Sequence, residues 1–497
     1  MPQMNTIIST FLGSSTPKSI NEPSGVPRSH QWSFIEAEIR RILLGSKSSK
    51  IPPDAELSNP EVAKWIRILA LLYGRLGRLS GGNKVFVCDN GDVAAREMLS
   101  AIDSATERVL MEVYIFDDSP LAARFVTALK NAAKRGCKVT LIIDDVGSLS
   151  FPILYHNELY KAGVEVLKFN PIANRKLAVG SLPFRNHKKV LVVDNHTAFC
   201  GSMNISKEST SHNMGGNGRF YDVNICLHGP VVCDLSDVVK RTLAMSSYKL
   251  DDIGQCLRAD PVEGGVIVQV LESDMSRVTR RNDIQSSIAT ILSNAEHNIY
   301  LTTSYFYPPG FLRRSLLAVK RRDVEIRMLL SGNSDIPGDI NATLHVLRKF
   351  FRKRAQQTTN NFRVFMTTKE HCHSKYVVVD DVWSSVGSFN WDRWSSRRNL
   401  EVSVGIFDPE TATKLKNLQR YKENQSVEYT RSQSLNRSMP LKIFDSLIHK
   451  LIRLSGRNCF DGLSNHGFKF RFKKAFIRTF IDDYAGELIA MSNMAGV

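Results

Sequence analysis

Two segments of the chain contain the same reactive residues at the same spacing. The first, NHKKVLVVDNHTAFCGSMN, runs from Asn186 to Asn204, and the second, HSKYVVVDDVWSSVGSFN, runs from His373 to Asn390. Each reads His-x-Lys, four residues, Asp, six residues and Gly-Ser-x-Asn. A second copy with every spacing kept indicates a duplicated unit, or two parts of one composite site.

The repeated side chains suit phosphoryl transfer. Together they supply two imidazoles, two ammonium groups and two amides, from His187, His373, Lys189, Lys375, Asn204 and Asn390. Ammonium and amide groups complement the equatorial oxygens of a phosphoryl group, on which charge is redistributed during transfer. One imidazole can attack phosphorus while the other protonates the departing alkoxide, and these roles reverse for the incoming alcohol. The doubled motif therefore predicts one composite site for phosphodiester exchange.

The aspartates and serines of the motif are expected to support this chemistry. Successive strand residues face opposite sides, so the histidine and lysine of each motif should share a face from which the aspartate is excluded. Asp194 and Asp380 each follow a Val-Val pair and should close a hairpin turn rather than transfer protons. Ser202 and Ser388 are expected beside the asparagines, on the phosphate.

Each histidine also needs an acceptor that fixes the proton of its far ring nitrogen. Asp222, in RFYDVNICL, and Glu401, in RRNLEVSV, are the candidates, and each opens an apolar strand. The run His371-Cys372-His373 could suggest a metal site, but no second group of ligands stands at a useful spacing. Neither a metal nor another cofactor is therefore predicted.

Composition limits the class of partner. The formal charge of +17 favours nucleic acid, phospholipid headgroups or phosphorylated substrates. The eight cysteines contain no Cys-x-x-Cys pair, so they do not suggest a disulfide scaffold. No apolar run reaches the ~20 residues needed to cross a bilayer, so any membrane contact should be peripheral.

Apolar runs alternate with helix-period segments in the same order in both halves of the chain. A strand, helix, strand, helix and strand are expected at 84–89, 94–105, 108–116, 121–136 and 138–144, and again at 266–271, 284–296, 298–306, 311–322 and 324–330. This alternation predicts βαβ units and mostly parallel sheets. We expect two similar α/β domains, at 83–255 and 256–425. A leader with a basic amphipathic helix should precede them (1–82), and a basic amphipathic extension should follow (426–497).

The doubled H-x-K-x4-D motif with G-S-x-N resembles the signature of the phospholipase D superfamily. The segments MEVYIF, TTSYFYP and GSFNWDRWSSRRNLEV are most similar to those of bacterial-type cardiolipin synthases. The resemblance implies two α/β sandwich domains with mixed sheets, which share one metal-independent active site. It also implies that His187 is the nucleophile and His373 the acid, with Asp222 and Glu401 orienting them.

The activity implied by this resemblance is transfer of a phosphatidyl group to phosphatidylglycerol, through a phosphohistidine intermediate. The donor stays open, because phosphatidylglycerol, CDP-diacylglycerol and phosphatidylethanolamine present the same phosphodiester. Alternatives are a phospholipase D, a phosphatidylglycerophosphate synthase or a phosphatidylserine synthase. A phosphodiesterase acting on nucleic acid is less favoured. The oligomeric state is also open.

Several segments outside the motif combine apolar and basic residues. Residues 441–454 predict a basic amphipathic helix with Ile443, Leu447, Leu451 and Leu454 on one side, and residues 348–354 and 466–476 interleave aromatics with cations. Such segments can bind an anionic membrane or single-stranded nucleic acid, or simply pack on the domains. The glycine-rich loop SKESTSHNMGGNGR suggests a mobile flap or a solvated connection. We expect peripheral membrane association, at the mitochondrial inner membrane or at the cytoplasmic face of a bacterial inner membrane.

Overall fold

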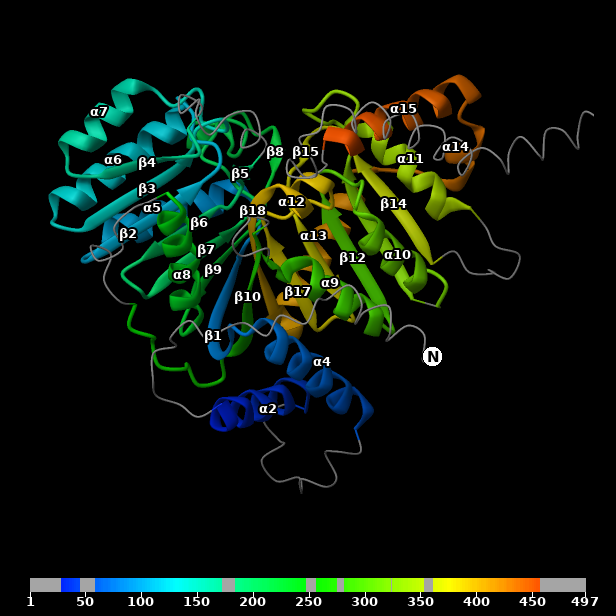
Figure 1. Cartoon of the computed structure of the whole chain (residues 1–497), viewed down its shortest axis with the longest axis horizontal. Helices are drawn as coiled ribbons and strands as arrows, with labels where there is room; N and C mark the ends of the chain where they lie inside the picture. Colours follow the sequence, from blue (N-terminus) through cyan, green and yellow to red (C-terminus); the bar gives the residue numbers. More distant parts are fainter. Residues whose placement is uncertain are drawn as a thin grey trace, which may run out of the picture.

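The computed structural model describes residues 28–44, 59–171, 184–246, 256–274, 281–322, 324–352 and 361–455. Within them the chain forms two halves that lie side by side, each with a central sheet and flanking helices (Figure 1). The helix and strand order expected from the sequence is found in both halves, with ends that shift by a few residues.

The first half contains β1 (Leu79–Cys88), α5 (Gly91–Ser104), β2 (Arg108–Val113), α6 (Pro120–Lys134), β3 (Lys138–Asp144), α7 (Ile153–Lys161), β4 (Glu165–Phe169), β5 (Arg185–Asn186), β6 (Val190–Val193), β7 (Thr197–Gly201), β8 (Phe220–Tyr221), β9 (Asn224–His228) and α8 (Val231–Met245).

The second half contains β10 (Val266–Asp274), β11 (Arg281–Asn282), α9 (Asp283–Asn294), β12 (Asn298–Thr303), α10 (Gly310–Val319), β13 (Glu325–Ser331), α11 (Asp339–Phe351), β14 (Phe362–Thr367), β15 (His371–Cys372), β16 (Tyr376–Val379), β17 (Trp383–Gly387), α12 (Arg393–Arg397), β18 (Asn399–Phe407) and α13 (Pro409–Glu423). Helices α2 (Arg28–Leu44) and α4 (Pro60–Leu76) precede β1, and β19 (Val427–Glu428), α14 (Arg431–Asn436) and α15 (Met439–Ser455) follow α13.

The two sheets have the same strand order. It is β4-β3-β2-β6-β7-β9-β1 in the first half and β14-β13-β12-β16-β17-β18-β10 in the second. The three strands at the outer end of each order are parallel, as the βαβ pattern predicted. The remaining pairings are antiparallel, because β6–β7 and β16–β17 are the predicted hairpins. The sheets are therefore mixed, and the expectation of mostly parallel sheets was wrong.

Strand β1 belongs to both sheets. Its first residues, Leu79 and Ser80, pair with β10, and Lys84–Cys88 pair with β9. The change of partner occurs around Gly82, which has φ 70° and lies so close to Pro261 that a Cβ would come within 2.4 Å of it. The predicted domain boundary at residue 83 is thus the point where one strand passes from one sheet to the other.

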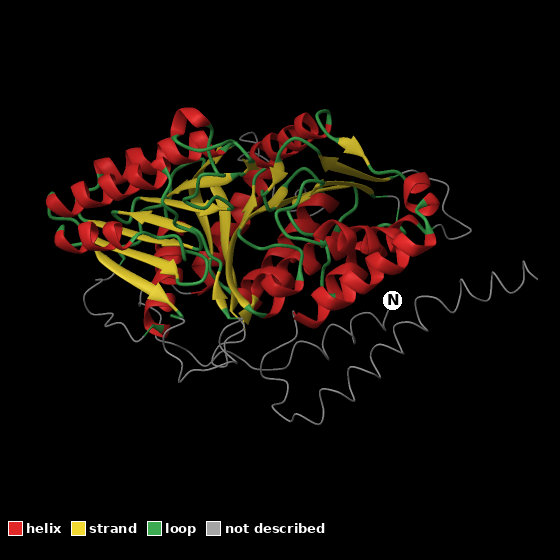
Figure 2. Cartoon of the chain, turned by 90° about the horizontal axis from the view of Figure 1, so that it is seen from above, coloured by secondary structure: helices red, strands yellow, loops and turns green. Residues whose placement is uncertain are grey.

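Three apolar cores follow from this arrangement. Helices α5, α6 and α7 cover the outer face of the first sheet, and α9, α10 and α11 cover that of the second. The core between the sheets takes residues from both halves and includes the buried faces of α8 and α13. Figure 2 shows the strands of both sheets converging on this middle region, with helices on the outside. The halves are therefore joined through a common interior.

The predicted leader contributes to the core beneath α9, α10 and α11. Trp65, Ile68 and Leu72 on α4 are at most 3 % exposed, and Trp65 packs on Phe407 with ring centroids 5.2 Å apart. The apolar stripe of this basic amphipathic helix is therefore buried against the second half.

Two further observations differ from expectation or bear on the membrane. Cys233 and Cys256 form a disulfide with their Cα atoms 5.5 Å apart, although their spacing had suggested no disulfide scaffold. Within the described residues, no helix combines the length and apolarity that crossing a membrane would require. The predicted basic segment 466–476 lies outside the described residues.

Candidate active site

The two motif histidines follow two short strands that cross between the halves. Strand β5 pairs in parallel with β18, and the His187 amide donates to the Leu400 carbonyl at 2.9 Å. Strand β15 likewise pairs in parallel with β8, and the His373 amide donates to the Tyr221 carbonyl at 2.9 Å. Each histidine is thus fixed beside the residue that precedes a carboxylate of the opposite half.

The orienting pairs are consequently crossed. His187 Nδ1 lies 3.0 Å from Glu401 Oε2, and His373 Nδ1 lies 2.7 Å from Asp222 Oδ1. With Nδ1 occupied by a carboxylate, Nε2 of each ring is the nitrogen left for chemistry. The sequence predicted both carboxylates, but it did not say which histidine each would serve.

The two motif serines bind these carboxylates. Ser202 Oγ donates to Asp222 Oδ1 at 2.6 Å, and Ser388 Oγ donates to Glu401 Oε2 at 2.5 Å. Each hydroxyl also lies against the backbone of the neighbouring strand. The structure therefore places both hydroxyls on the acids beside the histidines, and the expected contact of these serines with the phosphate stays a prediction.

The glycine before each serine is required by close packing. A Cβ on Gly201 would lie 2.0 Å from Asn224 Oδ1, and one on Gly387 would lie 2.3 Å from the Val402 carbonyl. These contacts bring β7 against β9 and β17 against β18. The Gly-Ser pair therefore sets the position of the serine relative to the carboxylate.

Both motif lysines are buried between the halves. Lys189 Nζ donates to the His187 carbonyl at 2.7 Å, and Lys375 Nζ donates to the His373 carbonyl and to Ser304 Oγ, the latter at 3.1 Å. Burial lowers the pKa of Lys189 to about 7 and that of Lys375 to about 8, and the nearby positive charge of Lys375 lowers the pKa of Lys189 further. Two closely spaced ammonium groups form a site that an anion would stabilise.

The imidazoles are held in the neutral form. Burial, with the charges of Lys189 and Lys375, lowers the pKa of His187 to about 4, although Glu401 opposes this. Burial and Lys375 likewise lower the pKa of His373. Burial alone would raise the pKa of Asp222, but its contact with His373 keeps that pKa below the ordinary value. A neutral imidazole beside an ionised carboxylate has the lone pair that a nucleophile needs.

The two asparagines differ in their contacts. Asn204 Oδ1 accepts from the Ile115 amide at 3.2 Å, which leaves its NH2 group to point elsewhere. Asn390 Oδ1 is buried and has no hydrogen-bond partner among the described residues. Both side chains are almost completely buried beside the motif serines.

The two aspartates lie in the expected turns, with φ of 50° at Asp194 and 53° at Asp380. Asp194 accepts from the amides of Thr106, Glu107 and Arg108 at 2.7–2.9 Å, where β2 begins. Asp380 accepts from the equivalent amides before β12 and forms an ion pair with Lys64 of α4 at 2.9 Å. These carboxylates tie the hairpin to the neighbouring strand and do not touch the imidazoles.

The halves differ two residues before each histidine, which the sequence analysis did not consider. In the first half, Arg185 forms a buried ion pair with Asp144 at 3.2 Å. In the second half, His371 occupies the same motif position, with Nδ1 2.8 Å from Ser331 Oγ and Nε2 3.6 Å from Asp335. A buried arginine–aspartate ion pair on one side is replaced by a hydrogen-bonded imidazole on the other. Reading the residue two positions before each histidine would have revealed the difference.

The glycine-rich loop leads directly into β8, whose Phe220 borders the site. The Phe220 ring stacks on His373, with centroids 4.8 Å apart and planes at 22°. Ser211 is fixed by Asp92 at 2.5–2.7 Å, and a Cβ on Gly216 would meet the Thr210 carbonyl at 2.1 Å. On the opposite side, the Tyr114 ring meets His187 edge-on at 4.9 Å. One aromatic ring therefore borders each histidine.

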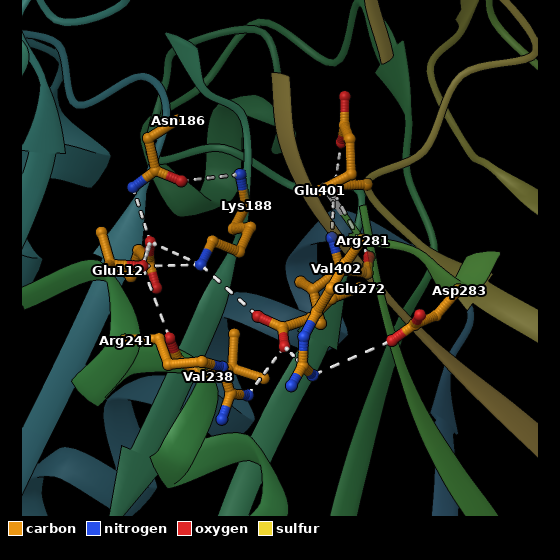
Figure 3. Close-up of polar contacts among 12 residues, drawn as sticks. Glu112, Asn186, Lys188, Val238, Arg241, Glu272, Arg281, Asp283, Glu401 and Val402 are labelled. Carbon is orange, nitrogen blue, oxygen red and sulfur yellow. Dashed lines mark hydrogen bonds and ion pairs between the residues drawn. The ribbon is translucent and has the colours of Figure 1, made fainter. Parts of the chain in front are cut away.

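A second cluster of charged residues, which includes Glu112, Lys188 and Glu272, packs beside the first motif (Figure 3). Lys188 points away from the site and donates to Thr242 Oγ1 at 2.6 Å, with Glu112 at 3.5 Å. Asn186 Nδ2 also donates to Glu112, at 2.6 Å. Burial favours the neutral form of Glu272, but Arg241, Arg78 and Lys188 outweigh it and lower its pKa to about 2. The residues on either side of His187 are thus anchored in the core between the sheets.

The described residues bring together one group suited in spacing to hold a metal, Glu61, Glu296 and His297. Lys64 Nζ lies 3.0 Å from Glu296 and 3.8 Å from Glu61, so both acids already share an ammonium partner. The group is not among the catalytic side chains.

A profile described as "Cardiolipin synthase, PLD-like domain" matches residues 98–227 and 288–421. These ranges make up more than half of the chain and contain every residue predicted for the site. The chain belongs to the PLD-like domain family of cardiolipin synthases. The two matched ranges also identify the halves as two copies of the PLD-like domain. Helices α2, α4, α14 and α15 lie outside both ranges.

Relatives of known name agree with this membership. Cardiolipin synthase B of Shigella flexneri and that of Escherichia coli K12 are each 29% identical over 328 residues, which cover 66% of this chain and 77% of theirs. Probable cardiolipin synthase YwiE of Bacillus subtilis is 26% identical over 333 residues, covering 66% of this chain and 63% of that protein. The crystal structure of phosphatidylserine synthase from Haemophilus influenzae has the same fold, with a TM-score of 0.59 at 13% identity over 75% of this chain and 94% of that one.

Proposed function

We propose that this PLD-like protein is a cardiolipin synthase that transfers a phosphatidyl group to a free glycerol hydroxyl of phosphatidylglycerol. The observation that carries the proposal is the crossed arrangement of His187–Glu401 and His373–Asp222 around two buried lysines. The names of the relatives supply the acceptor. The near-complete burial of both imidazoles also supports transfer over hydrolysis, because bulk water has little access to the site.

The reaction proceeds in two displacements. His187 Nε2 attacks the donor phosphorus, and the bond to the leaving alkoxide breaks as His373 Nε2–H gives that oxygen its proton. The phosphatidyl group is then bonded to His187. His373 next takes the proton of the acceptor hydroxyl, whose oxygen attacks phosphorus and releases His187.

The remaining side chains bind and orient. Lys189 and Lys375 neutralise the phosphoryl oxygens, and the amide groups of Asn204 and Asn390 donate to them. Binding of the phosphodiester anion favours protonation of His373, whose pKa is lowered in the empty site. Glu401 and Asp222 stabilise whichever imidazole carries positive charge.

The donor is phosphatidylglycerol, CDP-diacylglycerol or phosphatidylethanolamine, since each presents a phosphatidyl phosphorus to these groups. The leaving group is an alkoxide for the two phospholipids and cytidine monophosphate for CDP-diacylglycerol. The protein acts at a membrane surface, because its substrates are bilayer lipids. The bacterial sources of the relatives favour the cytoplasmic face of a bacterial inner membrane over the mitochondrial inner membrane.

The test is lipid mass spectrometry after incubation of the purified protein with phosphatidylglycerol and each donor in turn. Cardiolipin should form with at least one donor, and His187→Ala and His373→Ala should each abolish it. Near-normal activity in either variant would contradict a single shared site. Cardiolipin formation by neither wild type nor variants, with phosphatidic acid released instead, would identify a hydrolase.

The intermediate can be trapped with radiolabelled donor and rapid denaturation in alkali. Label on the wild-type protein should be stable in base and lost in acid, as expected for a phosphohistidine. It should be missing from His187→Ala. Label kept by His187→Ala and lost from His373→Ala would exchange the roles of the two histidines.

A further inference from the structure

The first observation concerns the loop that leads into α7. Leu149, Ile153 and Leu154 are 72, 80 and 60 % exposed, and we call these three side chains the α7 patch. The loop is nevertheless firmly attached, because Phe151 is buried against Phe116 with ring centroids 5.4 Å apart. Large apolar side chains are therefore held out in solvent by an anchored backbone.

The second observation is that the inward side of α15 carries buried polar residues beside the partly buried Ile448 and Ile452. Asp445 is buried and bonds to Arg437 at 2.6 Å and to Asn341 of α11 at 2.8 Å. His449 is also buried and stacks on His345 of α11, with ring centroids 4.5 Å apart.

The outer face of α15 is apolar instead. Its exposed apolar residues include Leu441, Phe444, Leu447 and Leu451, at 45, 48, 40 and 58 %, and we call these four the α15 stripe. The sequence analysis placed Leu447 and Leu451 on one apolar side of this helix. A surface helix of a globular protein normally packs that side against the core. In α15 that side is exposed instead, so it is available to contact apolar groups outside the described residues.

Both features adjoin the active site. Asp144 ends β3 beside the site, accepting from the Asn186 amide at 2.9 Å, and the next residues form the loop into α7. Ser331 ends β13, with its hydroxyl 2.8 Å from His371 Nδ1, and the next residues lead to Gly338, whose Cα faces Ile448 of α15. Figure 1 shows α7 and α15 along the same upper edge, on either side of β8 and β15.

The charges around the α15 stripe suit an anionic surface. The acidic residues of α11 and α15, Asp339 and Asp445, are both buried. Of the basic residues on these helices and their ends, Arg352 and Arg453 are exposed. An apolar face edged by cations is the pattern of helices that lie in the interface of an anionic bilayer.

We propose that the α7 patch and the α15 stripe are two footings on one anionic phospholipid bilayer, with the active site between them facing the headgroups. The proposal rests on the proposed function, which requires bilayer lipids to reach a buried site. It assigns the contact to folded residues on both halves. The α15 footing lies outside the ranges that match the family.

Sedimentation of the full-length protein with vesicles tests this proposal. Ile153→Gln/Leu154→Gln and Leu447→Gln/Leu451→Gln each remove apolar contact without changing charge. Each pair should weaken partition to phosphatidylglycerol vesicles about tenfold or more, because the partition of an interfacial surface follows its buried apolar area. Wild-type binding should be much weaker to phosphatidylcholine vesicles.

The matched control is Leu257→Gln/Tyr421→Gln, which alters side chains 79 and 60 % exposed outside both footings. It should bind vesicles like the wild type. Thermal unfolding of all variants shows whether each is folded. A lower melting temperature in Leu447→Gln/Leu451→Gln, with vesicle binding unchanged, would mean that the chain itself covers the stripe and would overturn the proposal.

Other outcomes are equally decisive. Unchanged vesicle binding in either footing variant would overturn the two-sided contact. Loss of a wild-type dimer in Leu447→Gln/Leu451→Gln, with vesicle binding kept, would assign the stripe to a second copy of this chain. Sedimentation needs no turnover, so it can be repeated with His187→Ala. Normal vesicle binding by a wild-type protein that makes no cardiolipin with any of the three donors would contradict the proposed function and leave the footings supported.

Discussion

His187 Nδ1 lies 3.0 Å from Glu401 Oε2, although the two residues belong to different halves of the chain. The reciprocal pair, His373 and Asp222, is 2.7 Å apart. Each half therefore supplies the acid that orients the other half's histidine. Because the pairing is carried by short interdomain strands, the relative position of the halves sets the position of both imidazoles.

The first prediction concerns this crossed pair. Glu401→Gln should lower kcat roughly 10²- to 10⁴-fold, because the amide cannot stabilise a charged imidazole and can favour the wrong tautomer. The same substitution in a His187→Ala background should have little further effect, since the two residues act as one unit.

Steady-state kinetics of the single and double variants test the coupling. Glu428→Gln is the matched control. Glu428 forms an ion pair with Arg363 at 2.6 Å, and neither residue belongs to the motif. Additive losses in the double variant would show that Glu401 acts independently of His187.

The second prediction concerns pH. Lys189 and Lys375 have pKa values lowered to about 7 and about 8, and both must be protonated to bind a phosphodiester. Because the pKa of His373, the general acid, is also lowered in the free enzyme, kcat/KM should already decline below this range and should fall more steeply as pH rises through it. His187, with a pKa lowered to about 4, stays neutral and nucleophilic down to that pH.

The profile should be measured from pH 5 to 10 on detergent-dispersed substrate. Lys375→Arg cannot lose its charge in this range, so its alkaline limb should reflect Lys189 alone and become less steep. A wild-type kcat/KM that is constant up to pH 9.5 would exclude the lowered lysine pKa values.

The third prediction concerns the difference between Arg185 and His371. Arg185→Gln removes one member of a buried ion pair and leaves Asp144 charged, so unfolding free energy should fall by about 3–5 kcal/mol. His371→Gln replaces a neutral hydrogen-bonding ring, and its loss should be nearer 1 kcal/mol. Urea unfolding of the two variants measures this difference. Equal losses would show that the Arg185–Asp144 ion pair adds no more stability than the hydrogen bonds of His371.

The fourth prediction concerns Asp194. Burial opposes ionisation of this carboxyl, but three backbone amides outweigh it and lower the pKa of Asp194. An acid with a lowered folded-state pKa contributes stability above its ordinary pKa and loses it as pH falls through the lowered value. Asp194→Asn should therefore cost about 1–3 kcal/mol at pH 7, and less at pH 3.

Unfolding at both pH values measures this cost, and turnover per folded molecule should stay near that of the wild type. A loss of kcat larger than tenfold without loss of stability would instead place Asp194 in the chemistry.

Much of the fold followed from the period of apolar residues. The βαβ segments of both halves are local, so alternation and spacing predicted them, and the hairpin turns at Asp194 and Asp380 followed from strand parity. The antiparallel hairpins β6–β7 and β16–β17 were predicted and the mixed sheets were implied by the resemblance, but the pairing of β1, β10 and β18 was not predicted, because it depends on contacts distant in sequence. The Cys233–Cys256 disulfide was missed for the same reason.

The sequence identified the residues of the candidate site, but it did not predict which of them contact one another. Asp222 and Glu401 were recognisable as acids that open strands, but nothing in a linear sequence chooses between pairing within a half and pairing across halves. Ser202 and Ser388 were assigned to the phosphate because they stand beside the asparagines, whereas the close approach at Gly201 and Gly387 turns them to the carboxylates. The apolar side of α15 was correctly located, but which side faces the protein depends on Asp445 and His449 meeting α11.

The crossed pairs have a consequence for the ancestry of the chain. A single ancestral half could have completed the same site by pairing with an identical copy, and both orienting contacts would then have been equivalent by symmetry. In such an assembly every substitution appears twice. Fusion into one polypeptide removes that constraint, and Arg185 opposite His371 shows that the two sides have since diverged. The phosphatidyl donor and the acceptor alcohol can thus contact different side chains, although the two halves of the site were once identical.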